Sequence, residues 1–170
     1  LYLKQGADFV ILGEGELTLL ELLKSLEANE KSQAHVAGLA FRLDEVSICT
    51  LPRPVLKDLD ALPDPAWDLI DMPAYQSLWQ ASEGYFSLNL ATTRGCPYKC
   101  NWCAKPIYGN RYNSRSPQRV VGEMSTLHAR YGVSHFWMAD DIFGLNPKWV
   151  QQFQQEILSR DLQIKIKIQS

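Results

Sequence analysis

Three cysteines crowd into one short segment, and their spacing predicts a metal site. They are Cys96, Cys100 and Cys103, in the order C-x3-C-x2-C. Three thiolates on so short a loop can occupy three corners of a cubic 4Fe–4S cluster, which normally takes four thiolates. The only other cysteine, Cys49, lies far upstream in a separate predicted domain. One iron would therefore lack a cysteine ligand, and an open iron indicates chemistry on a bound molecule more than simple electron transfer.

Other uses of these cysteines fit the sequence less well. A structural zinc site needs four closed ligands, and none of the three histidines stands at the spacing of a zinc knuckle. Disulfides are expected mainly in smaller secreted scaffolds, so a reducing cytosol is the predicted compartment. Cys49 is expected to be a small buried residue in a strand.

The first 50 residues have the pattern of the end of an α/β domain. A short apolar run at 8–12 predicts a strand, and leucines at helical spacing predict an amphipathic helix over 14–27. Segments 39–43 and 46–50 predict a hairpin that turns at Asp44 and Glu45.

A proline-rich connector is predicted over residues 51–84. Five of the nine prolines fall between positions 51 and 73. Because proline disfavours helix interiors and central strands, this stretch is expected to be extended, and the domain boundary is placed here.

Residues 85–170 predict strands that alternate with helices. The strands are expected at 85–91, 134–139 and 163–168, and the helices begin at the Ser116-Pro117 and Asn146-Pro147 pairs. This alternation is typical of parallel βα units. The predicted fold class is α/β, with the first three βα units of a partial TIM-like barrel after the end of a Rossmann-like domain.

Charged residues near the ends of these strands are further candidates. Asp140 and Asp141 follow the second strand, where barrel enzymes gather functional side chains, although a carboxylate there can equally cap the following turn. Four bases follow the cysteines and could hold an anion, or could simply form a solvated face. They are Lys105, Arg111, Arg115 and Arg119.

At these residues the sequence resembles a known family. The cysteine loop, with Trp102 before its last cysteine, resembles the cluster loop of radical S-adenosylmethionine (SAM) enzymes. Five further features resemble the subclass with an N-terminal cobalamin-binding domain, which includes the anaerobic magnesium-protoporphyrin monomethyl ester cyclases and the cobalamin-dependent radical methylases. They are the run 13–16 before a helix, the segment 62–68, the run 93–97, Ser116-Pro117 opening a helix, and Asp140-Asp141-Ile-Phe143 after a strand.

The resemblance implies cofactors and residue roles. Cys96, Cys100 and Cys103 would hold a 4Fe–4S cluster, and SAM would bind its open iron. Trp102 would contact the adenine, and Asp140 or Asp141 would hold the methionine ammonium group. Cobalamin would also bind, although the family's Asp-x-His-x-x-Gly pattern is absent here and would lie upstream. The reaction implied is methylation, cyclisation or a related change in a small or tetrapyrrole-like substrate, with an external electron donor.

Two alternatives come from other classes. An RNA-modifying methylthiotransferase shares the cysteine loop, but its upstream domain usually supplies three further cysteines, whereas only Cys49 is available here. A zinc or iron–sulfur binding module without catalysis is the second. Nineteen acids and seventeen bases give a net charge of −2, which offers no general attraction for nucleic acid. No apolar run approaches the length of about 20 residues that would span a bilayer.

Overall fold

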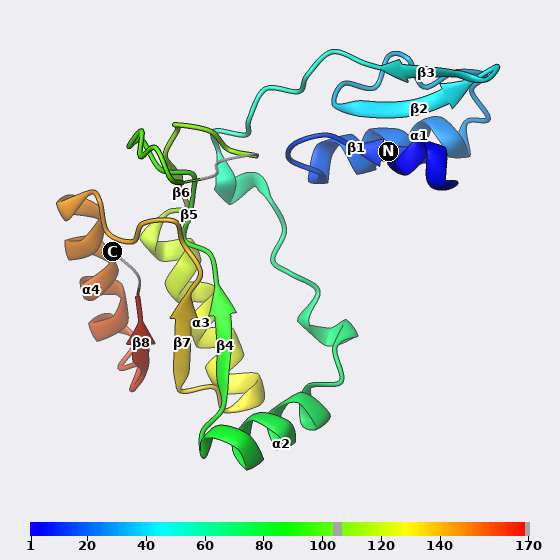
Figure 1. The fold of residues 1–170 in the computed structure, drawn as a ribbon. Helices are drawn as coiled ribbons and strands as arrows, with labels where there is room; N and C mark the ends of the chain where they lie inside the picture. Colours follow the sequence, from blue (N-terminus) through cyan, green and yellow to red (C-terminus); the bar gives the residue numbers. More distant parts are fainter. Residues whose placement is uncertain (104–106, 169–170) are drawn as a thin grey trace. The chain divides into compact units, whose positions relative to one another are not determined.

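The computed structural model describes residues 1–103 and 107–168 (Figure 1). The chain forms two compact units, Leu1–Leu56 with Cys100–Gly109 and Lys57–Lys99 with Asn110–Ser170. Within the described residues, no helix has the length and apolar character needed to cross a membrane. Lys105, one of the candidate bases, lies outside the described residues.

The first unit is a small antiparallel sheet with one long helix. Its elements, in order, are η1 (Tyr2–Gln5), β1 (Phe9–Ile11), α1 (Glu16–Glu27), β2 (Leu39–Leu43) and β3 (Val46–Cys49). The sheet order is β1-β2-β3, and both pairs are antiparallel. The predicted hairpin is confirmed: Asp44 and Glu45 have φ of 46° and 65°, the left-handed turn that suits a tight hairpin. No parallel strand pair occurs in the described part of this unit, so its Rossmann-like character stays a prediction.

One expectation about a side chain in this unit needs correction, and the burial of α1 is uneven. Cys49 lies in a strand as predicted, but it is exposed because β3 is an edge strand and only Ile48 of its residues packs towards the core. On α1, Leu22 is buried at 5% exposure, whereas five other leucines are 39–49% exposed. These five are Leu17, Leu19, Leu20, Leu23 and Leu26.

The second unit contains the predicted parallel βα repeat. Its main elements are β4 (Ser87–Leu90), α3 (Pro117–Tyr131), β7 (His135–Met138), α4 (Pro147–Ser159) and β8 (Lys165–Lys167). The strands pair in parallel in the order β4-β7-β8. Side chains on one face of this sheet form a buried core with α3 and α4. The strand members of that core include Leu88, Leu90, Phe136 and Met138.

Local capping explains why both helices begin where the sequence predicts. The Ser116 side chain accepts a hydrogen bond from the Arg119 amide at 3.2 Å, and Pro117 supplies the helical φ of the first turn. Asn146 caps α4 in the same way, accepting from the Lys148 amide at 3.0 Å. Gly132 ends α3 at φ 69°, a left-handed conformation that glycine adopts without strain.

The opposite face of the sheet is more polar. The strand register aligns Asn89, Trp137 and Lys167 in one row across β4, β7 and β8. The Lys167 ammonium lies 4.0 Å from the centroid of the Trp137 ring, within range of a cation–π contact.

The proline-rich segment is more structured than expected. It contains two single-turn 3₁₀ helices, η2 (Leu59–Ala61) and η3 (Trp67–Leu69), and a full α-helix, α2 (Met72–Glu83). The expectation of an extended chain is therefore wrong for 72–83. Pro73 lies in the first turn of α2, where its missing amide costs no helical hydrogen bond, and Asp71 caps the helix by accepting from the Ala74 amide at 3.1 Å.

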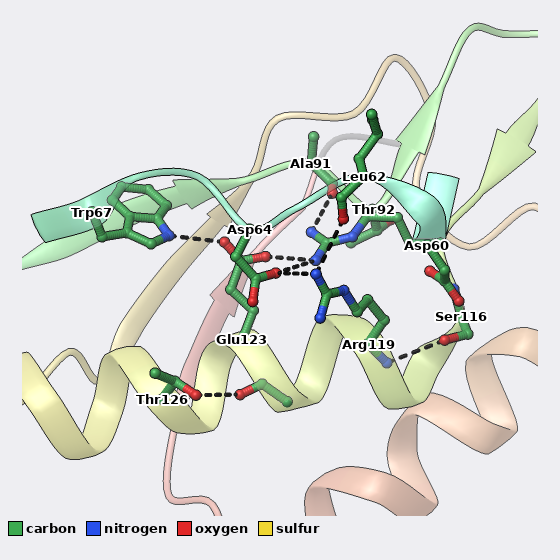
Figure 2. Close-up of polar contacts among 12 residues, drawn as sticks. Asp60, Leu62, Asp64, Trp67, Ala91, Thr92, Ser116, Arg119, Glu123 and Thr126 are labelled. Atoms are coloured by element: carbon green, nitrogen blue, oxygen red, sulfur yellow. Dashed lines mark hydrogen bonds and ion pairs between the residues drawn. The ribbon is translucent and has the colours of Figure 1, made fainter. Parts of the chain in front are cut away.

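Polar contacts fasten the first half of this segment to α3 (Figure 2). The Ser116 amide donates to the Asp60 carboxylate at 2.9 Å, and Arg119 donates to the Leu62 carbonyl at 3.1 Å. Trp67 donates from its indole nitrogen to Glu123 Oε1 at 2.9 Å. We call the whole set the connector clasp. It comprises Asp60, Leu62, Asp64, Trp67, Arg115, Ser116, Arg119 and Glu123.

The centre of the connector clasp is a buried ion pair. Glu123 is 4% exposed, and its Oε2 lies 2.7 Å from Arg115 Nη2, a distance of close charge contact without hydrogen-bond geometry. Asp64 lies 3.1 Å from Arg119 Nη2 and 3.6 Å from Arg115 Nη2. Two of the three arginines that the sequence offered as anion ligands, Arg115 and Arg119, are thus engaged by carboxylates of the chain itself.

Candidate functional site

The candidate site begins where β4 and β7 end at the same edge of their sheet. The register pairs Leu90 with Met138, and the Ala139 amide donates to the Leu90 carbonyl at 2.8 Å. Because the strands are parallel, the chain leaves both at one edge, where α/β proteins commonly place functional groups. Thr92–Thr93 and Asp140 are the next residues on the two strands.

A second, antiparallel pair closes the base of the cysteine loop. β5 (Thr93–Arg94) pairs with β6 (Asn113–Ser114), a contact that the sequence analysis did not predict. Gly95 follows at φ 81°, a left-handed conformation that turns the chain immediately before Cys96. The loop therefore starts from a backbone that is held on both sides.

The three loop cysteines present thiols suited to soft metal ligation. Cys96 is half-buried, Cys100 and Cys103 are exposed, and none of them is disulfide-bonded. The Cys103 amide donates to the Cys100 carbonyl at 3.4 Å, which forms a turn between these two residues. Their donor chemistry fits an iron–sulfur cluster. Among the residues that the structure describes, no group of three or more cysteine, histidine or carboxylate side chains is already gathered as a metal site, so the assignment depends on spacing and chemistry.

Trp102 offers an accessible aromatic surface beside the last cysteine. Its side chain is 90% exposed. An indole so exposed can stack on a flat ring system at little conformational cost, which is the role that the family resemblance implies for it.

The two candidate aspartates lie in different environments. Asp140 is 4% exposed and accepts hydrogen bonds from Thr92 and Thr93. Asp141 is exposed. A ligand approaching from solvent would therefore meet the Asp141 carboxylate first.

Tyr112 lies in the electrostatic neighbourhood of Asp140. Burial raises the pKa of its phenol above the ordinary value of 10.0, a hydrogen bond with the Leu145 backbone acts in the opposite direction, and the Asp140 charge raises the pKa further. No local sequence pattern signals this proximity, because a tyrosine in an irregular loop carries no periodic pattern.

Thr92 was missed for a similar reason. Its side-chain partner, Asp140, lies 48 residues away. The sequence marks the segment after the strand as functional through its cysteines, but it does not reveal which residue anchors that segment.

The fold resembles that of cobalamin-dependent radical SAM enzymes. It aligns with TsrM from Kitasatospora setae, a radical SAM methyltransferase solved with cobalamin and a [4Fe-4S] cluster, at a TM-score of 0.62 and 24% identity over 91% of this chain and 30% of that one. It also aligns with OxsB, solved with aqua-cobalamin and SAM, at a TM-score of 0.69 and 22% identity over 93% of this chain and 22% of that one. At these identities the likeness establishes the fold alone.

Sequence similarity points to a particular group of enzymes. The chain is 35% identical over 159 residues to the anaerobic magnesium-protoporphyrin IX monomethyl ester cyclase of Synechocystis sp., covering 94% of this chain and 31% of that protein. It is 34% identical over 142 residues to an uncharacterized methyltransferase of Pyrococcus horikoshii, covering 83% of this chain and 30% of the relative. The chain thus spans about a third of the length of these relatives, and no family model matches it.

Proposed function

We propose that this chain is part of a cobalamin-dependent radical SAM enzyme. The observation that carries the proposal is the C-x3-C-x2-C loop at the end of the first parallel strand, in a chain whose fold and sequence resemble enzymes of that class. Cys96, Cys100 and Cys103 would hold a 4Fe–4S cluster. When bound, this cluster would supply one electron for the reductive cleavage of SAM.

The chain's own residues bind and orient the cofactors. The Trp102 indole stacks on the adenine, and the exposed Asp141 carboxylate accepts hydrogen bonds from the methionine ammonium group. The paired strands β5 and β6 hold the base of the loop in a fixed direction. Cobalamin binds mainly through residues upstream of this chain, and an external donor in the cytoplasm supplies the electron.

The substrate is proposed to be a small organic molecule of the tetrapyrrole kind. Support comes from the sequence similarity to anaerobic magnesium-protoporphyrin IX monomethyl ester cyclases. The reaction is methylation, ring closure or a related transformation.

Iron analysis tests the proposal directly. The full-length protein, reconstituted under anaerobic conditions with iron and sulfide, is expected to hold about four irons per chain, as a 4Fe–4S cluster requires. Alanine at Cys96, Cys100 or Cys103 should abolish the cluster. Cys49→Ala is the matched control and should leave it intact, because Cys49 lies in the edge strand β3 and is not part of the C-x3-C-x2-C segment.

Two outcomes would contradict the proposal. Zinc in place of iron and sulfide would identify a structural metal module. Loss of the cluster in Cys49→Ala would show that the fourth iron is not open. With the cluster in place, SAM should alter the electron paramagnetic resonance spectrum of the reduced protein.

A further inference from the structure

The Asp140 carboxylate is buried at the end of β7, where it accepts hydrogen bonds from one short segment of the chain. Its Oδ1 accepts hydrogen bonds from the Thr92 amide at 2.7 Å and the Thr93 amide at 2.8 Å. Its Oδ2 accepts from the Thr92 hydroxyl at 2.6 Å. Thr92 and Thr93 are 0% and 5% exposed, so water offers these donors no alternative partner.

These contacts stand where the strand ladder stops. The last main-chain bond between the two strands joins Ala139 to Leu90. One residue further on, the Asp140 side chain accepts hydrogen bonds from the Thr92 and Thr93 amides, where the chain turns from β4 into β5. The Thr92 carbonyl is held from the other direction by the Arg115 amide at 2.9 Å. Thr92 is thus bound through its amide, hydroxyl and carbonyl.

The anchored segment leads directly into the cysteine loop. Cys96 comes three residues after Thr93, with the turn at Gly95 between them. Conformational freedom of the backbone at Thr92 and Thr93 would therefore also leave the Cys96 thiol less well oriented. A residue that orients a metal ligand through hydrogen bonds is commonly worth about 10- to 100-fold in metal affinity.

We propose that Asp140 is a positioning residue that fixes Thr92 and Thr93 and, through them, the direction in which Cys96 is presented to the cluster. This inference depends on the proposed function for its metal and assigns Asp140 a different role from Asp141. Asp140 acts inside the protein through hydrogen bonds, whereas the exposed Asp141 is the carboxylate available to a ligand.

Two substitutions separate hydrogen bonding from charge. Asp140→Asn keeps the shape: its amide oxygen can accept from both backbone amides, and its NH2 group can donate to the Thr92 hydroxyl. Asp140→Ala removes every one of these bonds. If Asp140 instead bound a cation, the asparagine would lose the charge and fail as the alanine does.

The experiment measures how fast reconstituted full-length protein loses iron to a chelator. Asp140→Ala should lose iron about tenfold or more faster than wild type. Asp140→Asn should stay within about threefold of it, since the hydrogen bonds remain. Thr92→Val, which removes only the hydroxyl contact, should fall between them. Equal rates for wild type and the alanine variant, or equal loss in Asn and Ala, would overturn the proposal.

A destabilised control excludes a general folding effect. Ser116→Ala removes the cap of α3 in the same unit without touching Thr92 or Asp140, so it should lower the midpoint of thermal unfolding and leave the rate of iron loss unchanged. If iron loss rises in Ser116→Ala as much as in Asp140→Ala, the effect reports stability and the positioning role is wrong.

Amide hydrogen exchange in the metal-free protein tests the same contact without a cluster. The Thr92 and Thr93 amides should be protected in wild type and Asp140→Asn and should exchange faster in Asp140→Ala. A wild-type protein that takes up no iron would refute the proposed function alone, because this exchange pattern still decides whether Asp140 positions the segment. Unchanged exchange in Asp140→Ala would refute the positioning role alone.

Discussion

Tyr112 is a residue whose ionisation reports on the interior of the candidate site. Its phenol pKa is raised chiefly by burial and additionally by the Asp140 charge. Since the folded-state pKa exceeds the ordinary value of 10.0, the contribution of Tyr112 to stability is fully present below that pH and is lost as pH rises through the folded pKa.

A spectrophotometric titration checks this prediction. The ultraviolet difference between wild type and Tyr112→Phe should isolate one phenol that ionises above pH 10.0. Asp140→Asn should lower the pKa of that phenol, because a nearby negative charge disfavours phenolate. A component that titrates at or below 10.0 would contradict the burial described for this side chain.

At the residue scale, the sequence predicts ligands better than it predicts their anchors. The three cysteines can be recognised because their spacing is local and their chemistry is distinctive. Asp140 is marked as a candidate by its place after a strand, yet its partner Thr92 is 48 residues away and belongs to another strand. Such a pairing depends on the parallel register of β4 and β7, which no local pattern specifies.

At the scale of elements, the connector clasp predicts unequal roles for two neighbouring arginines. Arg115 is 14% exposed and pairs with the buried Glu123, so Arg115→Met would leave a buried charge without its partner. We expect a loss of about 3–5 kcal/mol in the free energy of unfolding. Arg119 and Asp64 are 36% and 45% exposed, so Arg119→Met should cost at most about 1 kcal/mol.

Denaturant unfolding of the two variants measures the difference. Adding Glu123→Gln to Arg115→Met should recover part of the lost stability, because the isolated charge is then gone. Equal losses for the two arginine variants would show that the ion pair at the centre of the clasp is not desolvated as the structure describes.

The predictability of the helices follows from the same local chemistry. α3 and α4 begin at a serine or asparagine followed by proline, a signal contained in adjacent residues. α2 has the same kind of start, with Asp71 as cap and Pro73 in its first turn. The sequence did not predict α2 because the prolines upstream suggested an extended chain over the whole connector. Proline, however, disfavours only the interior of a helix and is tolerated in its first turn.

At the scale of the whole molecule, the chain first passes from one unit to the other next to an exposed lysine. Lys57 is exposed and follows Leu56, whose amide donates to the Glu14 carboxylate in the first unit. Leu59, two residues later, is buried in the second unit at 4% exposure. Anchored residues thus flank a short exposed stretch, Lys57 and Asp58.

Brief trypsin treatment of the full-length protein should therefore cut after Lys57 before it cuts after Arg115 or Arg119. Lys57→Gln should remove this early cut and leave later ones. The same digest tests the domain boundary predicted at residue 50. Early cleavage after Arg115 or Arg119 would refute the protection that the connector clasp should give.

The separation of Thr92 and Asp140 also has a consequence for the order of events during protein synthesis. A ribosome that adds about 5–20 residues per second needs about 2–10 s to travel the 48 residues between them. During that interval the cysteines have been made but their anchor has not. Cluster insertion that requires an oriented Cys96 must then wait until β7 and Asp140 have been synthesised and have docked beside β4.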